Sequence, residues 1–284
     1  MNTKLLQPIG IFDSGIGGLT VLRAIHQLMP DDPLLYLADQ EHVPYGPRPV
    51  EEVRQFSEAI TRHLLEQGSR LIVVACNTAS AAALKYLRQV FPEVPFVGME
   101  PAVKPAAEHT HSGVVGVLAT PATFQGELYA SVVERFGQGV KLLQHTCPGL
   151  VTQIENGALE SPETYRILEA ALRPMLEQGI DTVVLGCTHY PFVIPLIQRI
   201  TGPGVRVIDP APAVARQVQR LLVASSLLDL ETPTPEEVLR RPQHLLHLFT
   251  TGDPTRLEEM LPGLLGDRYP VEGLTWQKGE LVSV

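Results

Sequence analysis

LIVVACNTAS, residues 71–80, is an apolar run that turns polar at a cysteine. A short, continuous apolar run bounded by polar residues is typical of a buried strand in a parallel sheet. Residues 79–90 then show helical periodicity, so the chain passes from strand to helix just after Cys76. Because a strand is followed directly by a helix, this stretch predicts a parallel sheet with helices on both faces.

The same alternation extends in both directions from this stretch. Short apolar runs that we predict as strands are IGIF, LLYLA, VVGVLA, KLLQH, TVVLG, VRVID and HLLHLF. Segments with helical periodicity lie at 19–28, 50–66, 129–136, 163–176, 195–200, 214–222 and 254–261, the last with Asp253 as its N-cap. Residues 230–243, rich in proline and charge, are expected to form a solvated connection or a short helix. The sequence therefore predicts the α/β class.

The chain also resembles itself. LEQG at 65–68 recurs at 176–179, and a cysteine, Cys76 or Cys187, stands eight residues after the glycine of each copy. The same offset of 111 residues relates PAV at 101–103 to PAV at 212–214, and IGIFDS resembles VGVLAT at an offset of 106. We therefore predict two similar parallel-sheet α/β domains related by pseudo-twofold symmetry, with the active site in the cleft between them. The expected domains are residues 1–98 with 209–284, and residues 99–208.

The composition excludes several classes of protein. With 284 residues the chain is long enough for roughly two domains. It is 44% hydrophobic, too apolar for general disorder, and its net charge of −9 without a dense basic block argues against nucleic-acid binding. No signal peptide or membrane-spanning run is evident, and the three scattered cysteines fit reduced thiols. We expect a cytoplasmic protein with neither a nucleic-acid nor a membrane partner.

Glycines follow the first predicted strand in DSGIGG, residues 13–18, but they form no nucleotide-binding motif. A G-x-G-x-x-G pattern started at Gly15 would need glycine at the position of Thr20, and no G-K-[ST] follows. We interpret the glycines as permitting a tight turn and close helix packing. Asp13 is different, because an acidic side chain at the end of a buried strand must be hydrogen-bonded, paired or functional.

Cys76 and Cys187 end equivalent strands, and each precedes two polar side chains at an expected helix N-terminus. A single cysteine in such a place is usually a small buried hydrophobe, and a facing pair could form a disulfide, which suits a cytosolic chain badly. A zinc site of Cys76, Cys187 and His189 is a weaker alternative, because the C-x-H spacing is atypical of structural zinc.

Two opposed thiols suit the inversion of a carbon centre, which needs a base on one face and a proton donor on the other. Asp13 and His189 are the candidates to set the ionisation of Cys76 and Cys187, respectively. Cys147 has no partner at the duplicated offset and is interpreted as structural.

DSGIGGLTVL, VPYG, VVACNTAS, GVLATPAT and GCTHYP, in this order and at these spacings, closely resemble the bacterial glutamate racemases. The similarity runs from about Pro8 to Pro212. It implies an enzyme without cofactor or metal that interconverts L- and D-glutamate and supplies D-glutamate for peptidoglycan synthesis, cell-wall biogenesis and cell shape. Cys76 and Cys187 would be its acid/base pair, and the resemblance favours a homodimer.

The resemblance carries further residues into the site. The substrate contacts that it implies are Asp13, Ser14, Tyr45, Gly46, Asn77, Thr78, Thr188 and His189. Glu155 matches an acidic residue near the family's site, but Gly149 and Thr152 depart from the bulkier or proline residues usual there, so a solvated surface glutamate is the alternative. Thr120 is expected either to contact the ligand or to cap a helix.

Three other functions stay open at this point. A related racemase could act on aspartate or a hydantoin. A two-lobed amino-acid-binding protein without turnover would also use a crevice between similar lobes. Reversible disulfide formation between Cys76 and Cys187 would make a thiol redox switch. Exchange of the α-proton of glutamate with solvent separates the first hypothesis from these alternatives.

Overall fold

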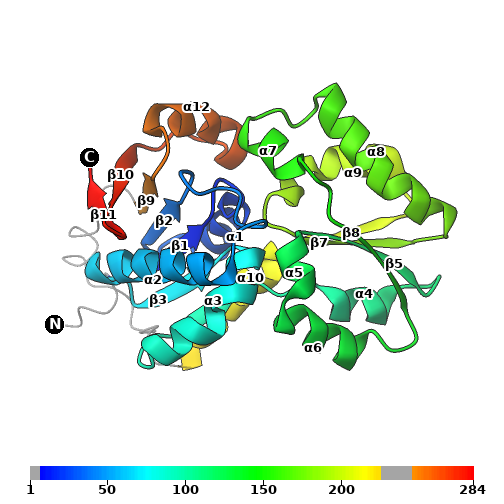
Figure 1. The fold of residues 1–284 in the computed structure, drawn as a ribbon, viewed down its shortest axis with the longest axis horizontal. Helices are drawn as coiled ribbons and strands as arrows, with labels where there is room; N and C mark the ends of the chain where they lie inside the picture. Colours follow the sequence, from blue (N-terminus) through cyan, green and yellow to red (C-terminus); the bar gives the residue numbers. More distant parts are fainter. Residues whose placement is uncertain (1–6, 225–244) are drawn as a thin grey trace.

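The computed structural model describes residues 7–224 and 245–284, so the predicted connection at 230–243 lies outside the described residues. Two lobes lie side by side (Figure 1). One lobe contains the two ends of the described chain, and the other contains its middle, drawn in green. Each lobe is built on one sheet.

The first lobe contains a seven-stranded sheet in the order β11-β10-β9-β2-β1-β3-β4. Its strands are β1 (Ile9–Asp13), β2 (Leu34–Ala38), β3 (Leu71–Val74), β4 (Phe96–Gly98), β9 (Leu246–Thr250), β10 (Val271–Gln277) and β11 (Glu280–Ser283). Every neighbouring pair is parallel except β10 and β11, which form an antiparallel edge. The predicted strand before the last helix, β9, joins this sheet beside β2.

The second lobe contains a four-stranded parallel sheet in the order β6-β5-β7-β8. Its strands are β5 (Val114–Ala119), β6 (Lys141–His145), β7 (Thr182–Gly186) and β8 (Arg206–Ile208). This order repeats β2-β1-β3-β4 of the first sheet. The register repeats as well, because Ile9 pairs with Leu71 and Val115 pairs with Thr182 at the offsets found in the sequence. The predicted fold of two similar parallel α/β sheets is therefore confirmed.

Helices connect the strands on both sides of the sheets. They are α1 (Leu19–Leu28), α2 (Val50–Glu66), α3 (Asn77–Val90), α4 (Val103–His109), α5 (Pro121–Gln125), α6 (Glu127–Phe136), α7 (Leu150–Glu155), α8 (Pro162–Glu177), the 3₁₀ helix η2 (Tyr190–Val193), α9 (Ile194–Thr201), α10 (Ala211–Ala224) and α12 (Pro254–Leu265). The helix that follows the fourth strand of each repeat crosses to the other lobe: α4 packs on α6 and β7, whereas α10 packs on α1 and β4.

Local sequence explains several of these boundaries. The carboxylate of Asp253 accepts hydrogen bonds from the backbone N–H groups of Thr255 and Arg256, which confirms it as the N-cap of α12. Helix α3 begins at Asn77 rather than at the predicted residue 79, because the sulfur of Cys76 is its N-cap and accepts from Ala79 N. The predicted strand at 71–75 is correspondingly one residue shorter.

The β10–β11 hairpin was not predicted. Its two turn residues, Lys278 and Gly279, both have positive φ, of 51° and 85°, as the twist of a two-residue hairpin requires. The alternation in VEGLTWQ is the sequence signal for β10, but Gly273 interrupts it.

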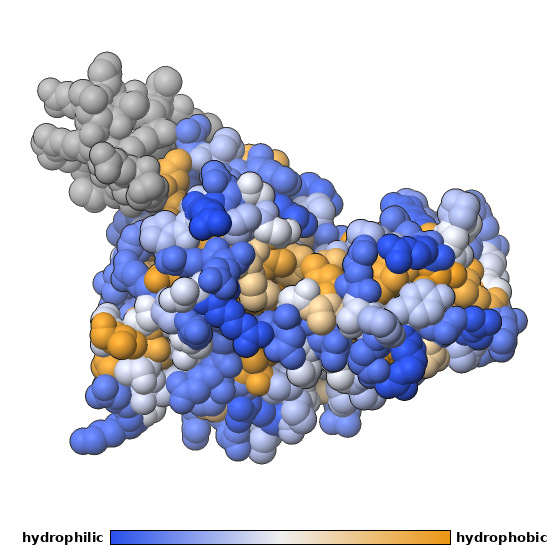
Figure 2. Space-filling view, turned by 90° about the horizontal axis from the view of Figure 1, so that it is seen from above, coloured by the Kyte–Doolittle hydropathy of each residue, from blue (hydrophilic) through white to orange (hydrophobic). Residues whose placement is uncertain are grey.

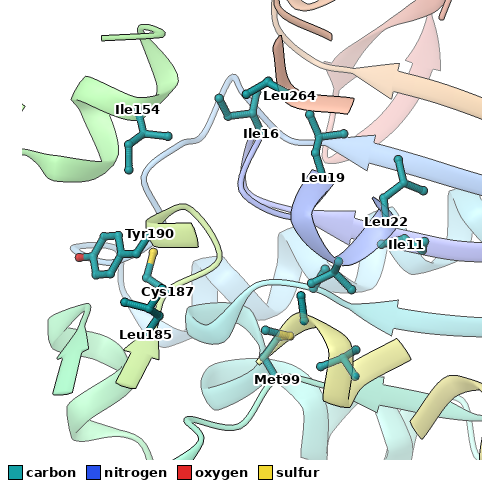
Figure 3. Packing of buried hydrophobic residues seen from close by; sticks show 14 of the residues in the cluster. Ile11, Ile16, Leu19, Leu22, Met99, Ile154, Leu185, Cys187, Tyr190 and Leu264 are labelled. Carbon is teal, nitrogen blue, oxygen red and sulfur yellow. The ribbon is translucent and has the colours of Figure 1, made fainter. Parts of the chain in front are cut away.

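The largest apolar cluster joins the lobes. It includes Ile16 and Leu19 of the first lobe and Leu185 and Tyr190 of the second, with Cys187 lying beside Tyr190 (Figure 3). Figure 2 shows a face that is largely hydrophilic, with apolar side chains reaching the surface near its middle. None of the helices in the described ranges combines the length and apolar character needed to cross a membrane.

Candidate active site

One small cavity between the lobes brings Cys76 and Cys187 together. Its volume is about 20 Å³. Its lining residues are Ser14, Pro44, Tyr45, Gly46, Cys76, Asn77, Thr78, Thr120, Val151, Cys187, Thr188 and His189. All the sequence-predicted site residues lie on this cavity except Asp13 and Glu155, which hydrogen-bond to the lining residues Thr188 and His189, respectively. A volume of this size holds about one water molecule, so the structure is a closed form.

Cys76 is placed by the end of β3 and the start of α3. Its Sγ accepts a hydrogen bond from Ala79 N at 3.4 Å and lies 3.8 Å from Ser14 Oγ. Burial, together with the charge of Asp13, raises the pKa of the Cys76 thiol well above its usual value. The sulfur on this side therefore tends to keep its proton.

Asp13 ends β1 and is fully buried. Its carboxylate accepts hydrogen bonds from Ser14 N at 2.8 Å, from Gly18 N at 2.6 Å and from Thr188 Oγ1 at 3.1 Å. Burial raises the pKa of Asp13 against the opposing effect of the nearby His189 charge. Because Thr188 belongs to the second lobe, Asp13 also links the two lobes at the site.

Cys187 follows β7, and its Sγ lies 3.8 Å from Nδ1 of His189. The other ring nitrogen, Nε2, lies 2.5 Å from Oε1 of Glu155. Burial acts to lower the pKa of His189, but its hydrogen bonds to Cys187 and Glu155 outweigh burial and hold that pKa well above the usual value. A protonated imidazole therefore lies beside the sulfur of Cys187.

Glu155 ends α7 and is 9% exposed. It accepts from Ile16 N at 2.8 Å and from Gln40 Nε2 at 3.0 Å, besides its pairing with His189. Burial acts to raise the pKa of Glu155, but the His189 interaction and these hydrogen bonds hold it below the usual value. The alternative of a solvated surface glutamate is therefore wrong.

Polar side chains of both lobes form the remaining wall. The Thr78 and Thr120 hydroxyls are 2.9 Å apart across the lobes. Thr120 is confirmed as a helix cap, since it accepts from Thr123 N as the N-cap of α5. It also lines the cavity, and its contact with a ligand stays a prediction. Asn77 is 3% exposed, and neither Nδ2 nor Oδ1 has a hydrogen-bond partner within the described chain. An unpaired buried amide is costly, so Asn77 is poised to bind a polar ligand group.

The glycines of DSGIGG have a more specific role than the predicted turn and helix packing. A Cβ at Gly17 would lie 2.5 Å from His189 Nδ1 and 2.7 Å from Asp13 Oδ2. A Cβ at Gly15 would lie 1.9 Å from Glu155 Oε1. A side chain at either position would therefore have to displace the charged groups of the site from their present places.

Sequence reasoning missed two polar residues, Asp39 and Gln40. Gln40 supports Glu155, and Asp39 accepts a 2.6 Å hydrogen bond from the hydroxyl of Tyr45, which lines the cavity. The signal was available, because Asp39 follows the apolar strand LLYLA as Asp13 ends IGIF.

Cys147 lies apart from the cavity, consistent with a structural role, and burial raises its pKa to about 12. All three cysteines are free thiols. Within residues 7–224 and 245–284, no three His, Cys, Asp or Glu side chains are grouped so that they could hold a metal ion.

Comparison with known proteins places this arrangement among racemases. The Asp/Glu/Hydantoin racemase family matches residues 18–218. The glutamate racemase of Roseiflexus sp. (strain RS-1) is 48% identical over 261 residues, which cover 92% of this chain and 93% of that protein.

Two solved structures are similar over nearly the whole chain. A glutamate racemase from Bacillus anthracis has a TM-score of 0.82 and 31% identity, covering 97% of this chain and 99% of that one. The Escherichia coli glutamate racemase, solved with L-glutamate and the activator UDP-MurNAc-ala, has a TM-score of 0.79 and 32% identity, covering 93% and 97%.

Proposed function

The chain belongs to the Asp/Glu/Hydantoin racemase family and is therefore an isomerase, and we propose that it interconverts L- and D-glutamate by proton transfer between Cys76 and Cys187. The observation that carries the proposal is that sulfurs from the two lobes line one cavity. A single base that returns its own proton tends to restore the original configuration. Two thiols on opposite faces of Cα instead invert it.

We infer the starting states of the two sulfurs from their different surroundings. In one direction, the Cys187 thiolate beside protonated His189 removes the α-proton and becomes a thiol. The Cys76 thiol then transfers its proton to the opposite face of the carbanion and becomes a thiolate. The reverse direction exchanges these roles, so bonds and charges balance over the reaction.

The substrate is held by the polar wall of the cavity. The hydroxyls of Ser14, Thr78 and Thr120, together with the Asn77 amide, can donate hydrogen bonds to the two carboxylates of glutamate. Thr188 also lines the cavity, and its hydroxyl donates to Asp13. Preorganised donors around the α-carboxylate also stabilise the carbanion, which is the larger part of the barrier. Asp13, Tyr45, Gly46 and His189 complete the set of proposed contacts.

Substrate entry requires the cavity to open, since about 20 Å³ cannot hold an amino acid. A surface pocket of about 730 Å³ adjoins the site on the side of Gly46 and Pro121. Arg48, Arg54 and Lys85 line this pocket. We infer that glutamate enters on this side of the cavity.

The same proposal extends to the cellular role, location and assembly of the enzyme. D-glutamate made by this enzyme would supply peptidoglycan synthesis, and with it cell-wall biogenesis and cell shape. We propose a cytoplasmic homodimer whose first domain is residues 1–98 with 209–284 and whose second is residues 99–208.

The decisive experiment is solvent deuterium incorporation at Cα by the metal-stripped protein without added pyridoxal phosphate. L- or D-glutamate in D₂O should yield the opposite enantiomer carrying α-deuterium, read by NMR and circular dichroism. Aspartate and hydantoins serve as competing substrates, and faster turnover of either would replace glutamate in the proposal. Tight glutamate binding without α-proton exchange would instead identify a binding protein.

A further inference from the structure

A second buried carboxylate supports the site from behind. Asp39 directly follows β2 and is 0% exposed. Its backbone N–H donates to the carbonyl oxygen of Asp13 at 3.0 Å, which ties the ends of two adjacent strands together. A carboxylate buried this completely is costly unless hydrogen bonds replace its lost hydration.

Four side chains from three separate segments replace the lost hydration of the Asp39 carboxylate. Tyr45 Oη donates to Asp39 at 2.6 Å, Trp276 Nε1 at 2.8 Å and Thr251 Oγ1 at 2.9 Å, and His42 Nδ1 lies 3.0 Å away. His42 and Tyr45 belong to the loop after β2, Thr251 follows β9, and Trp276 lies on β10. Asp39 therefore connects the C-terminal strands to that loop.

The loop in question is one wall of the catalytic cavity. Pro44, Tyr45 and Gly46 line it, and Gly46 lies against Thr120 of the second lobe, where an added Cβ would be 3.3 Å from Thr120 Cβ. Aromatic rings fill the space beneath the loop, with the ring of Trp276 5.1 Å from that of His42 and 5.6 Å from that of Phe56. Residues 44–46 thus bring the first lobe against the second at this edge of the cavity.

We propose that Trp276 is a positioning residue for substrate binding: through Asp39, the C-terminal hairpin holds Tyr45 and Gly46 where they close on glutamate. Trp276 does not touch the cavity, so its effect passes through the carboxylate. The inference rests on the proposed racemase function and adds to it a segment beyond residue 218, where the family match ends.

The expected kinetic signature is a change in KM. Loss of the indole N–H leaves Asp39 with one donor fewer and loosens Tyr45, while the sulfurs, His189 and Asp13 stay in place. Because two enantiomers have equal free energy, kcat/KM must be the same in both directions. A binding defect therefore raises KM for L- and D-glutamate together and leaves both kcat values near those of the parent.

The test uses Trp276→Phe in the full chain, with Thr275→Val as the matched control. Thr275 is the neighbouring residue on β10, and none of its side-chain atoms bonds Asp39. We expect Trp276→Phe to raise KM for both enantiomers roughly three- to tenfold, part of what a hydrogen bond to a charged group is worth. Thr275→Val should match the parent.

A double-mutant cycle sharpens the test. If Trp276 acts through Asp39 on Tyr45, its effect on KM should be smaller in a Tyr45→Phe background, because that background has already lost the hydrogen bond. KM does not depend on the fraction of folded enzyme, so partial unfolding cannot mimic the result. An unchanged KM in Trp276→Phe, additive effects with Tyr45→Phe, or a loss confined to kcat would overturn the inference. Racemisation by the parent would meanwhile leave the proposed function standing.

Discussion

The surroundings of Cys76 and those of Cys187 differ in charge, although the two cysteines occupy matching places in two matching sheets. Cys76 follows β3 beside the buried carboxylate of Asp13, whereas Cys187 follows β7 beside the His189–Glu155 pair. A negative neighbour favours the thiol and a positive neighbour favours the thiolate. The duplication thus supplies two sulfurs, and on the proposed mechanism their unlike partners make one the acid and the other the base.

The largest expected effect comes from removing either sulfur. Cys76→Ala and Cys187→Ala should each lower racemisation by about a thousandfold or more, within the range of general acid and base effects. Each variant should still exchange the α-proton of one enantiomer with D₂O, and the two variants should act on opposite enantiomers, as measured by NMR. Exchange of both enantiomers by one variant would show that the sulfurs are not divided between two faces.

The next effect distinguishes His189, the charged neighbour of Cys187, from Asp13, the charged neighbour of Cys76. His189→Asn and Asp13→Asn should each lower kcat by about a hundredfold. In a Cys76→Ser background, however, only His189→Asn should slow alkylation of Cys187 by iodoacetamide at pH 7, by about tenfold, because it removes the cation beside the sulfur. Cys147, with a pKa of about 12, stays a thiol and does not interfere. Equal slowing by Asp13→Asn would contradict the contrast between the two sides.

Glu155→Gln should alter the pH profile rather than abolish activity. Without the carboxylate, the pKa of His189 falls, so the imidazolium is lost at a lower pH. The alkaline limb of the pH profile of kcat therefore shifts to lower pH. Above that limb, activity should drop about tenfold for each unit that the pKa falls. Glu160→Gln is the control, because this exposed residue bonds only Arg199 among the described residues. An alkaline limb at the same pH in Glu155→Gln and the parent would refute the pairing.

The smallest effect is on the free energy of unfolding and concerns Asp181, which lies away from the site. Asp181 stands 111 residues after Arg70, and its carboxylate accepts from Thr110 Oγ1 and from the N–H groups of His111 and Ser112. Burial acts against the charge, but these hydrogen bonds outweigh it and hold the pKa of Asp181 below its usual value. Asp181→Asn should lower the free energy of unfolding by about 1 kcal/mol at pH 7 and leave kcat unchanged. The value is small because solvent exposure weakens the interactions of this carboxylate.

The sign of its pH dependence follows from the lowered pKa. The stabilisation is present above the unfolded pKa and is lost as pH falls through the folded one, so parent and variant should converge as pH falls below about 4. Urea unfolding at pH 7 and in acid measures this. A difference that persists unchanged in acid would assign the effect to packing instead.

Much of the fold was predictable because its signals are local. The predicted bounds of β2, β5, β6 and β7 and of α1 and α2 agree with the structure, since buried strands and amphipathic helices repeat apolar residues at characteristic periods. Short helices were missed, because α5 depends on the Thr120 cap and Pro121 at its start rather than on periodicity. The β10–β11 hairpin was missed because Gly273 and an exposed edge weaken its alternation.

The candidate site was predictable only in part. His189 stands two residues from Cys187, so its proximity to the sulfur could be read from the chain. Glu155 reaches His189 across 34 residues, and Trp276 reaches Asp39 across 237 residues. No periodicity or motif records contacts of that separation, and the catalytic roles of these residues stay predictions.

The amino-acid sequence by itself determined the α/β repeat, the duplication and the pair of cysteines at matching strand ends, because hydrophobic periodicity and internal similarity are properties of the chain alone. Tertiary structure decided which charge lies beside each sulfur, which groups of the site crowd Gly15 and Gly17, and how the C-terminal hairpin reaches Asp39. Those features depend on distances between segments remote in sequence, and such distances exist only once the two sheets have packed together.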